Sequence, residues 1–176
     1  MSLIDLQLQT ARLRLRALGP EDVDAIFRAF TPAVARYMEV IPPKQREDSE
    51  QFVTQVRARM QRNQEFVCAI EERATGRFFG CAGVHELKGP MPEAGIWIAE
   101  EAQGSGRGLE TITALRDWVR THRPDASHLR YPVDRANVPS RRIAEKLHGT
   151  IENQRRRRTE DGRELDIIEF HIPLAD

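Results

Sequence analysis

A glycine-rich segment in the middle of the chain has the composition of an anion-binding turn. Residues 103–108 read Gln-Gly-Ser-Gly-Arg-Gly. The three glycines let backbone N–H groups come close to a ligand without Cβ hindrance and adopt positive φ where needed. Free amides at the start of a helix, together with the positive end of the helix dipole, favour a phosphate group. We therefore predict that this turn binds phosphate, such as the pyrophosphate of a nucleotide-like cofactor.

The segments on either side of the turn have the periods of a strand and of a helix. Residues 93–98 alternate with both faces apolar, as expected of a strand that is covered on each side. From Leu109 the apolar residues recur at helical spacing through Leu115 and Val119, and Pro124 ends the pattern. A strand that leads into a glycine turn and a helix N-terminus is the arrangement that an anion site needs.

The spacing of the glycines argues against two common nucleotide sites. A P-loop ends in Gly-Lys-Ser or Gly-Lys-Thr, and neither occurs in this chain. In the dinucleotide fingerprint the glycines open the helix directly after the strand, whereas residues 100–103 intervene here. The turn is therefore not predicted to serve nucleotide hydrolysis or a dinucleotide cofactor.

Composition and charge fit one domain without a nucleic-acid or membrane partner. The chain has 176 residues, which we expect to form a single domain over residues 1–176. Lys plus Arg and Asp plus Glu both number 27, so bulk electrostatics give no reason to expect a nucleic-acid partner. No apolar run approaches the ~20 residues that span a bilayer, and the first residues lack a signal sequence. We expect a cytoplasmic protein, with Cys68 and Cys81 as buried free thiols rather than a disulfide.

The rest of the chain is predicted to supply helices and strands around this unit. Further strands are expected at residues 10–16, 65–70, 77–85, 127–133, 152–159 and 163–173. Further helices are expected from Pro20, from Thr31 and through residues 52–60. Pro132 lies inside a predicted strand and has no N–H, so this strand either is an ordinary edge strand or faces a gap on that side.

Two motifs resemble the GNAT N-acetyltransferase superfamily. Gln103, Gly106 and Gly108 fill the pattern Gln-x-x-Gly-x-Gly, which resembles the acyl-coenzyme A pyrophosphate loop of that family. The preceding residues 93–98 and the following Glu110 resemble its RimJ/RimL-like branch, which acetylates ribosomal-protein N-termini. Residues 137–147 resemble the Asn-x-x-Ser helix of the family, which closes with Glu-Lys-Leu-Gly, although here a histidine takes the place of that glycine.

The resemblance implies a fold and a cofactor. The implied fold is α/β, with a mixed, mostly antiparallel, twisted sheet flanked by helices on both faces. In that fold the fourth and fifth strands splay apart, and the pantetheine arm of acetyl-coenzyme A pairs with the exposed backbone of the fourth. The cofactor-binding residues that the resemblance implies are Trp97, Ile98, Ala99, Gln103, Gly104, Ser105, Gly106, Arg107, Gly108, Asn137 and Ser140.

The implied reaction is direct transfer of an acetyl group from a thioester to a primary amine. An aliphatic amine is largely protonated at pH 7, so a carboxylate or its bound water must take a proton. Glu93 and Glu101 lie beside the predicted central strand and are the catalytic candidates for this step. Glu100, Glu152 and Glu160 are further candidates.

Two other groups complete the expected chemistry. The tetrahedral oxyanion needs a donor, which we expect to be a backbone N–H near Trp97 to Ala99. Many GNAT enzymes protonate the leaving thiolate with a tyrosine seven residues after the asparagine, but this chain has Ala144 there. The RimJ/RimL-like branch shares that departure, and the resemblance moves the proposed acid to Ser140.

The acceptor and the oligomeric state stay open at this level. The acceptor is a protein N-terminus or a small amine such as an amino acid, polyamine or drug, and the chain is a monomer or a homodimer. A catalytically silent acyl-coenzyme A-binding module that regulates a partner is the alternative function. The histidines show no metal-ligand spacing, so no metal site is expected.

Four consecutive arginines, residues 155–158, lie on the last predicted hairpin. Strand side chains alternate, so the run is expected to split into two pairs on opposite faces. The pairs form a solvated edge that discourages aggregation, or one of them attracts an acidic acceptor or an RNA surface.

Overall fold

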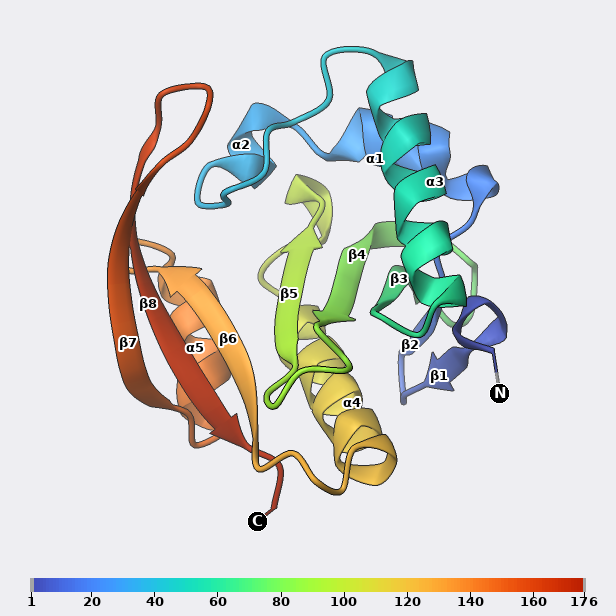
Figure 1. Cartoon of the computed structure of the whole chain (residues 1–176). Helices are drawn as coiled ribbons and strands as arrows, with labels where there is room; N and C mark the ends of the chain where they lie inside the picture. Colours follow the sequence, from blue (N-terminus) through green and yellow to red (C-terminus); the bar gives the residue numbers. More distant parts are fainter. Residues whose placement is uncertain (1, 176) are drawn as a thin grey trace.

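Among the described residues, 2–175, eight strands form one sheet (Figure 1). The strands are β1 (Gln7–Gln9), β2 (Leu13–Ala17), β3 (Phe66–Glu72), β4 (Phe78–His85), β5 (Glu93–Ile98), β6 (His128–Asp134), β7 (Thr150–Arg158) and β8 (Glu164–Pro173). Their order in this computed structural model is β1-β2-β3-β4-β5-β6-β8-β7. Neighbours pair antiparallel except for β5 and β6, which are parallel. The predicted domain, residues 1–176, extends one residue beyond the described range at each end.

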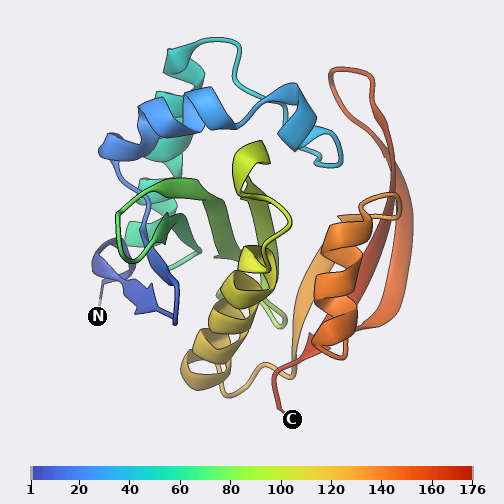
Figure 2. The same cartoon turned by 180° about the vertical axis from the view of Figure 1, so that it is seen from behind.

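Helices cover both faces of this sheet (Figures 1 and 2). They are α1 (Val23–Ala29), α2 (Pro32–Ala35), α3 (Arg46–Gln61), α4 (Arg107–His122) and α5 (Val138–Lys146), with short 3₁₀ helices η1 (Leu3–Asp5), η2 (Pro20–Asp22) and η3 (Glu100–Ala102). Trp97 of β5 contacts Phe30, next to α1, with ring centroids 4.9 Å apart. Phe66 of β3 contacts Trp118 of α4 at 5.4 Å. We call the side of the sheet that packs against α1 the α1 face, and the opposite side, which packs against α4, the α4 face. These two layers of helices confirm the predicted mixed sheet with helices on both sides.

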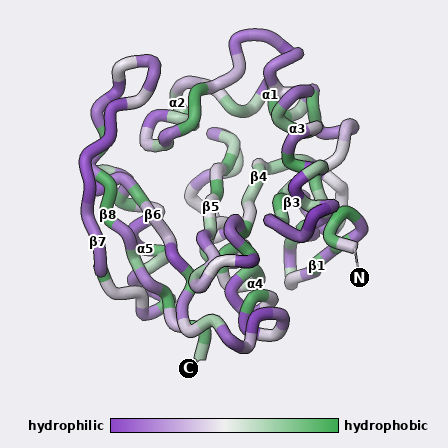
Figure 3. Tube along the Cα trace, in the orientation of Figure 1, coloured by the Kyte–Doolittle hydropathy of each residue, from purple (hydrophilic) through white to green (hydrophobic). Residues whose placement is uncertain are grey.

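The buried side chains are those that the sequence periods select. Leu13 and Leu15, the inward residues of the first predicted strand, are fully buried, and so are Ile112 and Leu115 on the apolar stripe of α4. Figure 3 shows the opposite pattern in β7, which is hydrophilic along most of its length at the edge of the sheet. Burial of the α4 stripe against the sheet fixes the helix, and with it the glycine turn at its start.

The structure differs from the predictions at several boundaries. β1 was not predicted, because a three-residue strand is too short to show a period. The next strand starts at Leu13 rather than at residue 10, since Thr10 N–H donates to Leu13 O in the turn between β1 and β2. α4 starts at Arg107, two residues before its first apolar position.

The central strands β5 and β6 diverge from a single contact (Figure 1). They pair at Glu93 and Arg130, where Arg130 N–H donates to Pro92 O, and then separate toward Ile98 and Asp134. Backbone N–H groups alternate between the two edges of a strand, so the nitrogen of Pro132 lies on the same edge as that of Arg130. Pro132 therefore faces the gap between β5 and β6, one of the two alternatives for this residue, and costs no ladder bond there.

The two cysteines lie on opposite faces of adjacent strands. Cys68 of β3 is paired in register with Ala82, and Cys81 of β4 with Ala69. Both thiols are buried and free, which confirms the prediction that they form no disulfide. Burial raises the pKa of Cys68 to about 12, so this thiol is inert at neutral pH.

Candidate active site

The predicted glycine turn has the backbone geometry of an anion site. Gly104 and Gly106 have φ of 78° and 79°, in the left-handed region that glycine adopts without strain. The first i→i−4 bond of α4 runs from Glu110 N–H to Gly106 O, at 3.1 Å. The amides of Arg107, Gly108 and Leu109 precede this bond and have no acceptor within the helix. These amides and the helix dipole favour a bound phosphate.

Two predicted side chains brace the turn. Gln103 Nε2 donates to Ile98 O at 2.9 Å and so ties the turn to the end of β5. Arg107 donates to Ala102 O at 3.0 Å and to the Ser105 hydroxyl, and its guanidinium stacks 4.1 Å above the Phe79 ring. Gln103 and Arg107 therefore shape the turn, which leaves its backbone amides to contact a ligand.

The sequence did not reveal a third brace, Arg12. Its Nη1 donates to Ser105 O at 3.0 Å, and its Nη2 lies 3.5 Å from the position that a Cβ on Gly106 would take. Glu110 holds Arg12 through the Arg12 N–H (3.0 Å) and Nε (2.7 Å), and accepts a bond from Thr10 Oγ1 at 2.5 Å. Burial raises the pKa of Glu110, but these bonds outweigh it and hold the pKa below its ordinary value. Arg12 thus places a cation beside the turn.

The edge of β5 that faces the gap carries free backbone groups. Ala99 N–H donates to Phe79 O at 2.8 Å, so this predicted cofactor residue has its amide engaged in the ladder to β4. By alternation the amide of Trp97 also faces β4, and the amides of Ile96 and Ile98 face β6. Of the three cofactor-binding residues predicted at this strand, Trp97, Ile98 and Ala99, it is Ile98 whose amide faces the gap. Ile96 was missed, although strand alternation could have found it.

Helix α5 lies on the other side of the gap and starts with a capped turn. Asn137 Oδ1 accepts a bond from Ser140 N–H at 3.3 Å, so Asn137 is the N-cap and Ser140 is in the first turn. The Ser140 hydroxyl lies beside that of Tyr131, which is buried and makes no hydrogen bond of normal geometry within residues 2–175. Burial raises the pKa of Tyr131 to about 12, and the nearby Ser140 hydroxyl lowers it in part. Ala144, where many family members have tyrosine, is fully buried.

The two catalytic carboxylate candidates lie at opposite ends of β5. Glu93 is at the closed end of the gap, 3.1 Å from Arg130. Burial raises the pKa of Glu93, although Arg130 opposes the shift. Glu101 is in η3 at the open end, next to the glycine turn. The structure therefore separates these two candidates.

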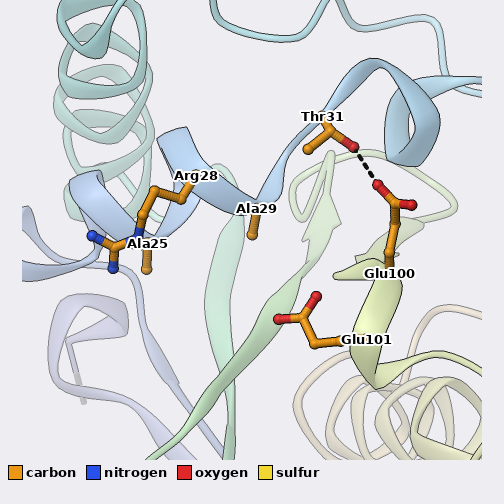
Figure 4. Close-up of a pocket in the computed structure, with 6 residues that line it drawn as sticks. All are labelled: Ala25, Arg28, Ala29, Thr31, Glu100 and Glu101. Atoms are coloured by element: carbon orange, nitrogen blue, oxygen red, sulfur yellow. Dashed lines mark hydrogen bonds between the residues drawn. The ribbon is translucent and has the colours of Figure 1, made fainter.

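A cavity of about 330 Å³ lies between α1 and η3 (Figure 4). It is lined by Ala25, Arg28, Ala29, Thr31, Glu100 and Glu101. Thr31 Oγ1 donates to Glu100 Oε1 at 2.9 Å, which joins the connection between α1 and α2 to the end of β5. Glu100 thus has a structural partner, and Glu101 is left as the carboxylate directed into the cavity (Figure 4).

The arginine run splits into two pairs, as its position in a strand predicts. Arg155 and Arg157 lie 3.6 Å and 3.3 Å from Glu39, in the loop between α2 and α3. Arg155 is also 3.7 Å from Glu169 of β8, which lies 3.5 Å from Arg130. Ion pairs therefore continue from Glu93 at the gap to Arg157 at the edge of the sheet. Residues 156 and 158 point to the other face.

The described residues show neither a metal cluster nor a membrane helix. Within residues 2–175 no three His, Cys, Asp or Glu side chains gather in a way that could hold a metal ion. No helix in this range is both long and apolar enough to cross a bilayer.

Comparison with known proteins agrees with this geometry. The acetyltransferase (GNAT) domain family matches residues 12–150. A comparison with curated protein sequences finds no match.

Solved structures share the fold across nearly the whole chain. A putative ribosomal-protein-serine acetyltransferase from Vibrio cholerae has a TM-score of 0.78 at 22% identity, covering 97% of this chain and 98% of its own. The ribosomal L7/L12 alpha-N-protein acetyltransferase RimL in complex with coenzyme A has a TM-score of 0.82 at 20% identity, covering 97% and 100%. Spermidine N-acetyltransferase from Vibrio cholerae, in complex with coenzyme A and spermine, has a TM-score of 0.79 at 20% identity, covering 94% and 98%.

Proposed function

This chain belongs to the GNAT acetyltransferase family and is an acetyl-coenzyme A-dependent acyltransferase, and we propose that it acetylates a primary amine on a peptide N-terminus or a small molecule. The observation that carries the proposal is the gap between β5 and β6, which opens directly onto the glycine turn. A phosphate-binding turn at one end and a free strand edge along the side suit a ligand that is anionic at one end and extended beyond it.

The residues around the turn and the gap fit coenzyme A. The amides of residues 107–109 and the Arg12 guanidinium would hold the pyrophosphate, and the free edge of β5 at Ile96 and Ile98 would pair with the pantetheine arm. Bound acetyl-coenzyme A supplies an acetyl thioester to the reaction. An N–H of Ile96 or Ile98 would donate to the carbonyl oxygen as negative charge develops on it.

Ser140 is the proposed proton donor to the leaving thiolate. It lies in the first turn of α5, across the gap from β5, and its N–H rather than its hydroxyl takes part in the helix cap. Its hydroxyl is therefore free of that structural duty. Tyr131 beside it offers a second hydroxyl with which Ser140 can exchange a hydrogen bond.

The acceptor amine is proposed to enter on the α1 face. Glu93 lies at the closed end of the gap, where its carboxylate can attract an ammonium group. The ion pairs from Arg130 to Arg157 border the same side, so an acceptor with a carboxylate near its amine would also find a partner there. We do not assign Glu101 to proton abstraction, because it lies at the far end of β5, beside the turn proposed to hold the pyrophosphate.

A screen of acetyl acceptors tests this function. Purified protein is incubated with acetyl-coenzyme A and a panel of N-terminal peptides, polyamines and amino acids, and release of free coenzyme A thiol is followed. We expect at least one amine class to stimulate release in a saturable way. Binding of acetyl-coenzyme A without stimulated release by any amine would support the silent acyl-coenzyme A-binding module instead.

A further inference from the structure

A histidine and a buried glutamate form a pair on the α1 face, next to Glu93. His85 is the last residue of β4, and its register partner in β5 is Glu93. Its Nδ1 lies 2.9 Å from Oε2 of Glu65, which immediately precedes β3 and is 5% exposed. Neither His85 nor Glu65 belongs to the motifs described above.

The buried glutamate is ionised and held in place. Burial raises the pKa of Glu65, but the bonds from His85 and Arg59 outweigh it and leave the pKa below its ordinary value. Arg59 Nε donates to Oε1 of Glu65 at 2.8 Å, which leaves Oε2 for the histidine. An ionised carboxylate can only accept a hydrogen bond, so the ring nitrogen beside it must be the donor. Nδ1 therefore carries the proton in the neutral ring, and Nε2 carries the lone pair.

The free ring nitrogen lies over a bare section of β5. A Cβ on Gly95 would be 3.9 Å from His85 Nε2, and within residues 2–175 no other heavy atom beyond the chain neighbours of Gly95 comes within 4 Å of that position. Gly95 lies two residues from Glu93, on the same side of the strand. The surface over Gly95 is therefore open, and His85 Nε2 lies at its border.

The same section of β5 is where the reacting thioester is expected. The gap is open at the glycine turn and closes at Glu93 and Arg130. A chain that is anchored at the turn and follows the edge of β5 therefore directs its far end toward Gly95 and Ile96. Helices α4 and α5 cover the α4 face there (Figures 1 and 2), so an acceptor approaches from the α1 face. His85 and its register partner Glu93 both point to that face.

We propose that His85 Nε2 accepts the proton of the acceptor ammonium, and that Glu65 is the positioning residue that orients the ring. This proposal rests on the proposed function and adds the general base to it. In the step, the ammonium gives one proton to Nε2, and the freed lone pair forms the C–N bond to the acetyl carbon. The C–S bond then breaks, and the second proton lost by nitrogen ends on the coenzyme A thiolate. The products are the amide, free thiol and imidazolium, which returns its proton to solvent.

Charged groups lie on several sides of His85. Glu65, immediately before β3, and Glu93 of β5 are the carboxylates beside the ring. Of the nearby cations, Arg59 is held by Glu65, and Arg130 by Glu93, Glu86 and Glu169. Lys88 lines the cavity beside the ring. A cavity of about 480 Å³ borders the ring and provides the path to solvent. It is lined by Arg59, Gln64, Glu65, His85, Glu86, Lys88 and Gly89.

The test compares His85→Gln with Glu93→Gln in steady-state kinetics at saturating acetyl-coenzyme A. We expect His85→Gln to lower kcat by ~10²-fold or more with a basic amine at pH 7, the usual scale for loss of a general base. Glu93→Gln should act mainly on KM for the acceptor. His122→Gln, on the exposed end of α4, is the matched control and should keep wild-type kinetics.

The basicity of the acceptor separates a proton-transfer role from a structural one. Fluorine next to the amine lowers its pKa, so a fluorinated analogue reaches the site already neutral and needs no base. The His85→Gln defect should shrink strongly with this analogue, whereas a folding or packing defect would be the same for both acceptors. Glu65→Gln should show the same dependence on acceptor basicity, more weakly, with acetyl-coenzyme A affinity unchanged.

A second variant tests the place of the reaction without touching the histidine. Gly95→Ala places a methyl group at ordinary contact distance from Nε2, so the fold should be unaffected while the open surface is filled. We expect kcat to fall with little change in melting temperature. If the wild-type protein acetylates amines and both His85→Gln and Gly95→Ala keep wild-type kinetics, the proposed role of His85 is overturned and the proposed function is not. A wild-type protein that acetylates no amine would overturn the proposed function itself.

Discussion

Ser140 shows how a side chain can be separated from the structural role of its position. Its backbone N–H donates a hydrogen bond to Oδ1 of Asn137, the N-cap residue, and its hydroxyl lies beside that of Tyr131. The family resemblance implies a proton-donor role for this serine, and its place in the first turn of α5 offers helix capping as the other explanation. The geometry assigns the cap to Asn137, and this makes the two roles independently testable.

Replacing Ser140 with alanine should therefore affect turnover more than stability. We expect Ser140→Ala to lower kcat by ~10²-fold or more with unchanged acetyl-coenzyme A affinity, measured by steady-state kinetics and calorimetry. Asn137→Ala is the matched control, and it should lower the free energy of unfolding by about 1 kcal/mol through loss of the cap. If Ser140→Ala keeps the wild-type kcat, this hydroxyl is not the acid.

Glu110 predicts a pH dependence of stability at the glycine turn. Its pKa in the folded protein lies below the ordinary value of about 4.5, so its bonds to Thr10 and Arg12 stabilise the fold above that pH. The contribution is lost as the pH falls through the folded-state pKa. Glu110→Gln should thus lower the melting temperature at pH 7, and its difference from wild type should narrow below about pH 4.5.

Residue roles could be predicted where a motif is contiguous and not where it forms through the fold. Gly106 and Asn137 were found because a turn and a helix start have fixed spacing along the chain. Arg12 reaches Ser105 across 93 positions, and His85 meets Glu65 across 20, so neither contact leaves a local pattern. The pairing of β3 with β4 brings His85 to Glu65, and the packing of β2 beside α4 brings Arg12 to the glycine turn.

At the scale of elements, the backbone conformation of the glycine turn is what is proposed to bind the ligand, because it presents free amides to a phosphate group. Gly106→Asp adds a negative charge where phosphate is proposed to lie. Two like charges about 4 Å apart repel by ~4 kcal/mol at an effective dielectric constant of 20. We therefore expect coenzyme A affinity, measured by calorimetry, to fall by more than ~10-fold.

A second glycine provides a matched control for the backbone strain that Gly106→Asp introduces. Gly162, in the turn between β7 and β8, has φ of 87°, and no atom lies within 4 Å of the position of a Cβ. Gly162→Asp should cost a similar ~1–2 kcal/mol for a left-handed residue. It should leave coenzyme A affinity unchanged. Equal affinity in Gly106→Asp and wild type would remove the basis for a cofactor site at this turn.

Strand β7 gives a second prediction at this scale, because its arginines alternate between faces. Arg155 and Arg157 join the ion pairs that border the proposed acceptor side, whereas Arg156 and Arg158 lie on the opposite face. Replacing residues 155 and 157 together with glutamine should raise KM for an acidic acceptor and weaken its salt dependence. The same change at 156 and 158 is the control. Wild-type acceptor kinetics in both double variants, across a salt series, would make the run a solvated edge.

The element boundaries show what a period can and cannot predict. The helix over Arg107–His122 and the strand at Glu93–Ile98 were found because their apolar spacing extends over several turns or alternations. β1 was missed because three residues carry no period, and its place is fixed by pairing with β2. The gap beside Pro132 was one of two alternatives, since a missing N–H does not distinguish a gap from a sheet edge.

At the scale of the molecule, the parting of β5 and β6 organises the proposed chemistry. Helices α4 and α5 lie on one side of the gap, and the ion pairs from Glu93 to Arg157 border the other. A donor held along β5 from the α4 face and an acceptor entering from the α1 face would meet near Gly95. The two halves of the proposed site come from one continuous sheet.

The most direct test of this account follows the acetyl group itself. The protein is incubated with acetyl-coenzyme A labelled in the acetyl group and with an acceptor from the screen, and amide and free thiol are quantified together. We expect label on the amine nitrogen, one thiol released for each amide formed, and loss of both products in Gly106→Asp. If acetyl-coenzyme A binds to the wild-type protein but stays intact in the presence of every amine tested, the proposed acetyl transfer is contradicted.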